Sequence, residues 1–563
     1  MILVDEIKPM SLTGSSPYSH VKICIFKQQD HGTLWDFQQQ LKGVCDQGLG
    51  PIPIKWRGEC QGGVNFTCNR KIMGARSYGI EESVRDYKGH GTHVASILAG
   101  KQVQRSDMLS AFDDAISDGV DIIAVSLRSS TEDVTSDPIA IGAFHAMQRG
   151  ILTVQATGND GPSLYSSTGD VPWIFSVAAS NSDRKIVNKA ILGDGTVLVG
   201  TSINGFPSIQ EKIPLLYGRQ VTNTCSENDA RIGPLLVAAM NKNEMNLVKS
   251  YQKSTKEPKV QTYRSEAIYD PQAPLIASFS SRGPCEFIGD IIKPDVTAHA
   301  VEILAAFSPM GSQSETFIDE CPVKYSILSG TSMACPHVAA AAAFVKSFRL
   351  DWSPSAVKSA LMTTTWEMNA NQSLDVEFAY GSGHINPLKA KDPGLVYEIS
   401  REDYFKIWCN ISQSTNAGCH ANLTIKELNY PSMAVQVDMN SAFVVSFPRT
   451  VTNIGKADST YVASISGGTK LYITIVPDIL QFTTLNLKRS FVVTVKGKAI
   501  KLPHKKASMS LLWTDSVHNV RSPIVVYTGN STSSVGASAP RRFSQNFVIL
   551  FVSILIGHCI YIF

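Results

Sequence analysis

An alanine-rich helix that follows a glycine turn, at residues 328–345, limits most strongly the folds open to this chain. Gly330 permits the turn, and the alanines allow the helix to pack close to its neighbours. Pro336 is tolerated if it falls in the first helical turn, which has no intrahelical N–H bond to lose. Ser332 then lies beside free backbone N–H groups, at the positive end of the helix dipole. It is either the N-cap of a core helix or a nucleophile whose developing charge is stabilised there.

A second glycine turn, at residues 88–100, leads into a short apolar helix that begins with His90. His90 and His93 are three residues apart and share a helical face, an arrangement that would also suit a metal. Zinc needs a third ligand and usually a nearby acid, and the chain has no His-Glu-x-x-His pattern. We therefore expect no metal at these histidines, and no cofactor.

A third segment, at residues 150–162, is typical of a buried strand that ends in a turn, with Asn159 at its tip. An asparagine between glycines often serves only as a left-handed turn residue. Its side-chain amide would equally suit an oxyanion hole. Both interpretations of Asn159 stay open from this segment alone.

Taken together, the three segments resemble the subtilisin family of serine proteases, and the later half of the chain resembles plant secreted subtilases. The resemblance implies that Ser332 is the nucleophile, His90 the general base and acid, and Asn159 the oxyanion donor; His93 would be a structural helix residue. The order His, Asn, Ser differs from the Ser, Asp, His order of α/β-hydrolases, and no Gly-x-Ser-x-Gly elbow surrounds Ser332. Lipase and esterase functions are therefore disfavoured.

The reaction that the resemblance implies is acyl transfer: Ser332 attacks a peptide carbonyl while His90 removes its proton, and water hydrolyses the acyl-enzyme. Protein or peptide substrates would contact Ser126 and Leu127, at the end of the strand expected over residues 120–127. Arg128 follows where the family normally has glycine, and it would crowd or charge that edge. The competing function is that of a catalytically inactive homologue, a secreted or surface glycoprotein that binds peptides.

The third member of the implied triad is a carboxylate, which the family carries directly at the end of an apolar strand, in Asp-Thr-Gly or Asp-Ser-Gly. Residues 21–26 predict this strand, but a Lys-Gln-Gln run at residues 27–29 precedes Asp30. Three extended residues cover roughly 10 Å, enough to carry a carboxylate beyond hydrogen-bonding reach of His90. Asp30 is the candidate triad acid, and without a carboxylate at His90 the expected loss of turnover is roughly 10⁴-fold.

A core strand is expected to be missing between the helices at residues 88–100 and 107–119. Only residues 101–106 connect these helices, whereas the family places a glycine-rich loop and a parallel strand there. Two helices on the same face of a parallel sheet need a strand between them. A degenerate gene copy, a splice form and a faulty gene model all stay open as explanations.

The expected fold class is α/β: a subtilisin-like parallel sheet flanked by helices, followed by a fibronectin type III-like β-sandwich. The sandwich is predicted by short segments with period-two alternation, as in residues 443–447 and 490–495. The expected units are the N-terminal segment 1–20, the peptidase domain 21–390 with a shortened protease-associated insertion at 184–272, the connector 391–427, the fibronectin type III-like domain 428–528, the polar linker 529–546 and the hydrophobic tail 547–563.

Composition excludes few functions. A net charge of +3, without long runs of one sign, gives no reason to expect a nucleic-acid partner. Cys60 and Cys68, and likewise Cys409 and Cys419, are close enough in sequence to bridge in an oxidising compartment. Five asparagines open Asn-x-Ser/Thr sequons for glycosylation: Asn65, Asn371, Asn410, Asn422 and Asn530.

The two ends of the chain bear on its location. The resemblance implies an extracellular or cell-surface protein, although residues 1–10 show neither the basic nor the apolar region of a signal peptide. Residues 547–563 are apolar apart from His558, and could barely span a membrane. Arg541 and Arg542 would then hold the preceding domains in the cytosol. A cleaved glycolipid-anchor signal removes that conflict, so anchor signal, membrane helix and artefactual tail all stay open.

Overall fold

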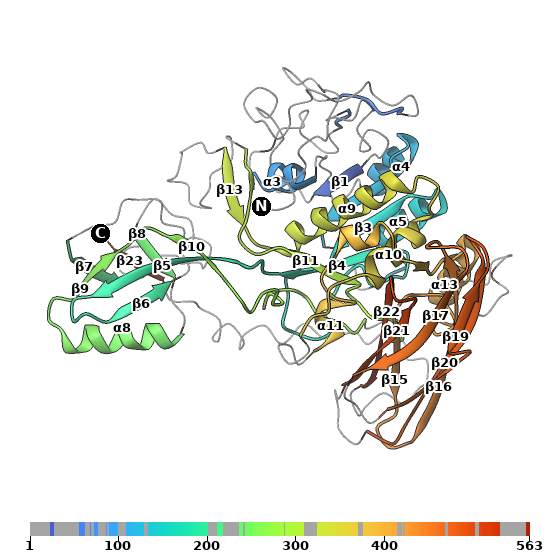
Figure 1. Cartoon of the computed structure of the whole chain (residues 1–563). Helices are drawn as coiled ribbons and strands as arrows, with labels where there is room; N and C mark the ends of the chain where they lie inside the picture. The colour runs from blue at the N-terminus through green and yellow to red at the C-terminus, as the bar shows by residue number, and fades with distance from the viewer. Residues whose placement is uncertain are drawn as a thin grey trace.

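The computed structural model contains a central α/β body, a smaller β unit, and a C-terminal β domain drawn in orange to red (Figure 1). It describes residues 23–27, 56–61, 68, 73–76, 86, 89–98, 108–128, 133–200, 211–217, 236–239, 242–285, 288–308, 324–369, 375–413, 419, 423–467, 471–500, 506–529 and 559–562.

The central body is built on a parallel sheet of five strands in the order β1-β2-β3-β4-β11. The middle strands β2, β3 and β4 are buried at every position, as expected for a parallel sheet covered on both faces. Their carboxyl ends lie at one edge, where such sheets place their functional residues. The strands are β1 (Ile23–Lys27), β2 (Ile122–Ser126), β3 (Leu152–Ala156), β4 (Ile174–Ser180) and β11 (Val296–His299).

Helices cover this sheet. The long helix α9 crosses β2, β3, β4 and β11, and it also packs against α3. α5 starts where Asp137 accepts a hydrogen bond from Ile139 N at 2.8 Å, with Pro138 in the first turn, where its missing N–H costs nothing. The helices of this body are α3 (His90–Leu98), α4 (Met108–Ser117), α5 (Pro138–Gln148), α9 (Thr331–Phe348), α10 (Pro354–Thr363), α11 (Glu377–Tyr380), α12 (Pro387–Ala390) and α13 (Arg401–Ser412).

A hairpin of β12 (Ile303–Ala306) and β13 (Tyr325–Leu328) leads the chain into α9. All but one of the elements of the smaller β unit fall within residues 184–272, the stretch in which the sequence predicts an insertion. The exception is β23, near the end of the chain, which pairs with two strands of the unit. Its elements are β5 (Arg184–Leu192), β6 (Val197–Gly200), β7 (Ile213–Tyr217), β8 (Leu236–Ala239), α8 (Lys242–Ser254), β9 (Lys259–Thr262), β10 (Glu266–Tyr269) and β23 (Cys559–Ile562).

The C-terminal domain is a sandwich of two sheets, ordered β14-β16-β20-β18 and β15-β22-β21-β17-β19. Its core is aromatic and aliphatic: Phe491 and Trp513 meet edge to face, with ring centroids 5.0 Å apart. The expected fold class is thus confirmed. The strands are β14 (Leu395–Val396), β15 (Met433–Val437), β16 (Phe443–Asn453), β17 (Ser459–Ser466), β18 (Tyr472–Val476), β19 (Ile479–Phe482), β20 (Lys488–Gly497), β21 (Lys506–Thr514) and β22 (Asn519–Thr528).

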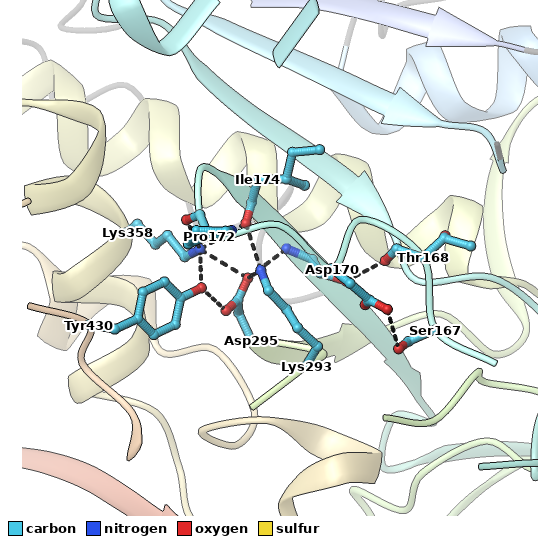
Figure 2. Close-up of polar contacts among 10 residues, drawn as sticks. Ser167, Thr168, Asp170, Pro172, Ile174, Lys293, Asp295, Lys358 and Tyr430 are labelled. Atoms are coloured by element: carbon cyan, nitrogen blue, oxygen red, sulfur yellow. Dashed lines mark hydrogen bonds and ion pairs between the residues drawn. The ribbon is translucent and has the colours of Figure 1, made fainter. Parts of the chain in front are cut away.

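A buried cluster of charges joins the C-terminal domain to the central sheet (Figure 2). Asp295, at the entrance to β11, accepts from Lys293 Nζ at 2.8 Å and lies 3.1 Å from Lys358 Nζ of α10. The hydroxyl of Tyr430, just before β15, donates to the other oxygen of Asp295. Both lysines also donate to the carbonyl of Ile174, at 2.8 Å each. The cluster lies at the amino edge of β4 and β11, away from the carboxyl ends of the strands.

Opposing effects set the charges in this cluster. Burial raises the pKa of Asp295, but Lys293 and Lys358 outweigh it and hold that pKa below its usual value. Burial lowers the pKa of Lys358 well below that of an ordinary lysine, although Asp295 opposes this shift. Burial and the nearby Asp295 carboxylate together raise the pKa of Tyr430 well above its usual range. Tyr430 therefore stays protonated, and its hydroxyl can donate a hydrogen bond to Asp295.

Candidate active site

Asn159 is tied to the first residue of α9 by its side-chain oxygen. Thr331 donates to Asn159 Oδ1 twice, from its backbone N at 3.0 Å and from its hydroxyl at 2.9 Å. Because the backbone N–H can only donate, these bonds identify the oxygen of the amide unambiguously. The Nδ2 group has no partner within the described residues and is available to stabilise an oxyanion. A β-carbon at Gly330 would lie 3.5 Å from Asn159 Nδ2, so the amide borders the turn into α9.

The loop that carries Asn159 is itself held in place by Ser281. The backbone N of Ser281 donates to Gly158 O at 2.9 Å, and the Ser281 hydroxyl accepts from Asp160 N at 3.1 Å. Gly158 has a φ of 103°, a region that favours glycine. Asn159 itself is exposed, whereas the loop behind it is fixed on both sides. The amide is thus preorganised, as an oxyanion donor needs to be.

Ser332 is the second residue of α9, not its N-cap, because the helix begins at Thr331 after the N-cap residue Gly330. Pro336 is therefore the sixth helical residue, and its expected place in the first turn is wrong. A proline there cannot donate to the carbonyl of residue i−4, which is Ser332. The hydroxyl of Ser126, at the end of β2, donates to Ser332 O at 3.0 Å instead. A side chain from the sheet thus replaces the missing helical bond.

His90 begins α3 and is half-buried. The turn before it is held by Asp86, a fully buried carboxylate that accepts from Gly89 N at 2.9 Å and Thr92 N at 2.6 Å. This is an N-capping arrangement, and it fixes where the helix starts. Since α3 packs against α9, the helix that begins with His90 lies beside the helix that carries Ser332.

His93 lies one turn further along α3 and is fully buried. Its Nε2 is 2.8 Å from Ile303 O and 3.1 Å from Ser326 O, in the hairpin that leads into α9. Burial lowers the pKa of His93 to about 4, so the ring is neutral at pH 7 and Nε2 is the protonated donor. These contacts fit a structural role, as the sequence predicts for His93.

The carboxyl end of β1 carries a lysine. β1 runs from Ile23 to Lys27, and Lys27 pairs in register with Ser126 of β2. This is the strand end at which the resemblance expects an aspartate. Asp30, the candidate triad acid, lies outside the described residues. β1 is also the terminal strand of the described sheet, and residues 99–107 between α3 and α4 lie outside the described part of the chain.

The expected substrate-contacting residues follow directly on β2. Ser126 and Leu127 are 5% and 6% exposed, and Leu127 O accepts from Gln155 Nε2 at 3.3 Å. The next residue, Arg128, is 55% exposed in its side chain, and its guanidinium forms an ion pair with Asp160. The sequence indicates that Arg128 charges this edge, but it does not reveal the partner in a loop 32 residues away.

Comparison with known proteins decides the family. Residues 101–383 match the model of the Subtilase family, and residues 427–526 match that of the Fibronectin type-III domain. Subtilisin-like protease SBT4.4 of Arabidopsis thaliana is 41% identical, over 86% of this chain and 79% of that protein. Subtilisin-like protease SBT4.11 of the same plant is 42% identical, over 89% of this chain and 79% of its own length. The chain belongs to the subtilase family. It is therefore, by homology, a serine-type endopeptidase that acts on peptides or proteins.

The remaining predicted sites of this subtilase are divided between described and undescribed residues. Cys60 is disulfide-bonded to Cys68, and Cys409 to Cys419. Of the five sequons, only Asn410 lies within the described residues; it is exposed on α13, and its Nδ2 donates to Leu423 O at 2.6 Å. The other four lie outside them: Asn65, Asn371, Asn422 and Asn530.

The described residues bear on the metal and membrane predictions. Among those residues, no group of three His, Cys, Asp or Glu side chains is arranged to hold a metal ion. Within the same part of the chain, no helix combines the length and apolar character needed to cross a membrane. Of the hydrophobic tail, the described residues 559–562 form β23.

Sequence reasoning missed two residues that support the subtilase site. Asp86 was detectable, since a carboxylate shortly before a glycine turn and a helix is a capping signal. Ser281 was not, because the segment that carries it is separated from Asn159 by more than a hundred residues. The pairing of Ser281 with the Asn159 loop follows only from the packing of that segment against the end of β3.

Proposed function

We propose that this subtilase hydrolyses peptide bonds through an acyl-enzyme on Ser332, at a turnover reduced by the loss of the carboxylate that should orient His90. Ser332 Oγ attacks the scissile carbonyl while His90 takes its proton, and the tetrahedral oxyanion is stabilised by Asn159 Nδ2. His90 returns the proton to the leaving amine, and water then hydrolyses the ester.

The observation that carries the catalytic half of this proposal is the anchoring of Asn159 to the residue before the nucleophile. Two hydrogen bonds from Thr331 hold the amide oxygen, so the donor nitrogen is directed by a residue adjacent to Ser332. An oxyanion donor held in this way needs no reorganisation during the reaction. An asparagine that served only as a turn residue would not need its side chain bound to α9.

The proposal of a reduced turnover rests on the residue at the carboxyl end of β1. The strand pairs with β2 up to Lys27 opposite Ser126, so a lysine stands at the strand end that should carry an aspartate. An ammonium group cannot accept the imidazole N–H that fixes the tautomer of His90. These observations favour a nucleophile and an oxyanion donor without the third triad member.

A fluorophosphonate probe tests this function on the full chain. We expect covalent labelling of Ser332, detected by intact mass, that disappears in Ser332→Ala. We also expect slow peptide hydrolysis, and an Asp30→Asn variant with unchanged turnover. A folded chain that takes up no probe would contradict the proposed catalysis, while a sharp loss of turnover in Asp30→Asn would assign the triad acid to Asp30.

A second candidate is a catalytically inactive homologue that binds peptides, and Lys27 at the end of β1 is the observation that favours it. Peptide binding without probe labelling would support this alternative. For either function we propose an extracellular or cell-surface location. Disulfides persist in oxidising compartments, so Cys60–Cys68 and Cys409–Cys419 support that location.

A further inference from the structure

Arg128 and Asp160 form an ion pair at the carboxyl edge of the central sheet. Arg128 Nη1 contacts Asp160 Oδ2, and the two side chains are 55% and 46% exposed. We propose that this pair determines the charge preference of the peptide site, because each residue cancels a charge with which the other alone would select peptides. This inference rests on the proposed function, since it concerns the peptide that Ser332 attacks.

Each residue of the ion pair lies close in sequence to a residue that contacts the start of α9. Asp160 directly follows Asn159, whose side chain is bound to Thr331. Arg128 lies two residues after Ser126, whose hydroxyl binds Ser332 O. Both charges are therefore one or two residues from groups that contact the start of α9. A peptide whose carbonyl reaches Ser332 and Asn159 must pass close to them.

The ion pair contributes little to the stability of the fold. Exposed ion pairs contribute little to stability, because solvent screens the charges and both side chains must be ordered. The Asn159 loop is held by backbone groups instead, through Ser281. Within the described residues, the guanidinium of Arg128 and the carboxylate of Asp160 have no other partner than each other. A substrate charge can thus compete for either one.

Removing Asp160 and removing Arg128 should change the charge preference of the site in opposite directions. Without Asp160, the Arg128 guanidinium attracts an acidic side chain of the peptide and repels a basic one. Without Arg128, the Asp160 carboxylate does the reverse. At this half-exposed position the interaction is partly screened, so we expect changes in relative affinity of about three- to tenfold. The unaltered pair predicts a site that prefers uncharged side chains next to the scissile bond.

Peptide binding by the full-length Ser332→Ala chain tests the inference without turnover. The probes are three fluorescent peptide pools that are identical except for a central Glu, Gln or Lys, and the readout is the ratio of dissociation constants for the Glu and Lys pools. Asp160→Asn should shift this ratio about three- to tenfold toward Glu, and Arg128→Gln should shift it by a similar factor toward Lys. The double variant should return it to the parent value, and 1 M NaCl should remove both shifts.

Lys406→Gln is the matched control. Lys406 forms a partly exposed ion pair with Asp403 on α13, at 2.9 Å, so Lys406→Gln changes the net charge as Arg128→Gln does. We expect it to leave the ratio unchanged.

Ratios that stay within twofold of the parent in both single variants would overturn the inference, as would shifts in the same direction or the absence of binding to any pool at millimolar concentration. Fluorophosphonate labelling of the unaltered chain separates this result from the proposed function. Labelling without a charge shift removes only the inference, and a charge shift without labelling removes only the catalysis.

Discussion

The hydroxyl of Ser126 donates to the backbone carbonyl of Ser332 at 3.0 Å, and so takes the place of the helical N–H that Pro336 lacks. Ser332, the proposed nucleophile, is thereby attached to the central sheet through its own main chain. A proline in the second turn of a helix normally leaves the carbonyl four residues earlier unpaired, at a cost in stability. Here the carboxyl end of β2 satisfies that carbonyl and fixes the position of Ser332 relative to the strand.

We predict that Ser126→Ala lowers peptide turnover by about tenfold, because Ser332 loses its attachment to β2. The partly buried carbonyl, left without its partner, should also lower the free energy of unfolding by about 1 kcal/mol. Pro336→Ala restores a helical N–H for the same carbonyl, so the Ser126→Ala/Pro336→Ala double variant should recover much of both losses. Turnover and denaturant unfolding check this cycle; a double variant no better than Ser126→Ala would contradict it.

Asn159→Asp should reduce the rate of peptide hydrolysis by about 10²- to 10³-fold, with little effect on KM, because it removes the proposed oxyanion donor. The substitution keeps an oxygen that can accept from Thr331, so the loop and the start of α9 should hold. Steady-state kinetics provide the measurement. If kcat stays within threefold of the parent chain, Asn159 is a turn residue and not an oxyanion donor.

Tyr430→Phe should destabilise the junction between the C-terminal domain and the central sheet. It removes the hydroxyl that donates to Asp295 within a fully buried cluster of charges. A hydrogen bond to a buried charge is worth about 1.5–3 kcal/mol of unfolding free energy. Tyr397→Phe, which removes a neutral bond to Ser522 at 2.9 Å, is the matched control and should cost less. Denaturant unfolding of both variants makes the comparison, and equal losses would argue against a special role for the cluster.

Buried histidines should make the fold sensitive to acid. Burial lowers the pKa of His93 and of His337 to about 4. The unfolded chain binds these protons near pH 6.5, before the folded chain does, so stability falls as the pH drops from 6.5 to about 4. Each histidine contributes a slope of about 1.4 kcal/mol per pH unit in this window. Unfolding at pH 7, 6, 5 and 4 should show a shallower slope for His337→Asn than for the parent chain, whereas parallel slopes would exclude His337.

The arrangement of the three segments proposed to be catalytic is predictable, because each combines a glycine turn with an apolar helix or strand of clear period. The segments at Ser332, His90 and Asn159 point to one fold, and the described sheet agrees with it. The alternating segments after residue 428 likewise predict the sandwich. In β16, for example, more buried and more exposed residues alternate over much of the strand.

What could not be predicted depends on contacts between distant segments. The sequence predicts that Pro336 lies in the first turn of the helix, where no N–H is needed. Nothing near it in the sequence indicates that Ser126 donates to the carbonyl that Pro336 leaves unpaired. The Arg128–Asp160 pair and the attachment of Tyr430 to Asp295 are likewise invisible in local pattern. A lysine buried beside an aspartate contradicts ordinary burial preferences, and only the tertiary structure supplies the partners that make it tolerable.

The central claim is that this subtilase has its nucleophile but lacks the carboxylate that orients His90. Peptide turnover of Lys27→Asp, measured beside the parent chain, Lys27→Asn and Ser332→Ala, tests it most directly. We predict slow hydrolysis by the parent chain, none by Ser332→Ala, and a gain of at least about tenfold in Lys27→Asp but not in Lys27→Asn, since a triad carboxylate is worth up to roughly 10⁴-fold. Equal turnover of the Lys27→Asp and Lys27→Asn chains would contradict the claim.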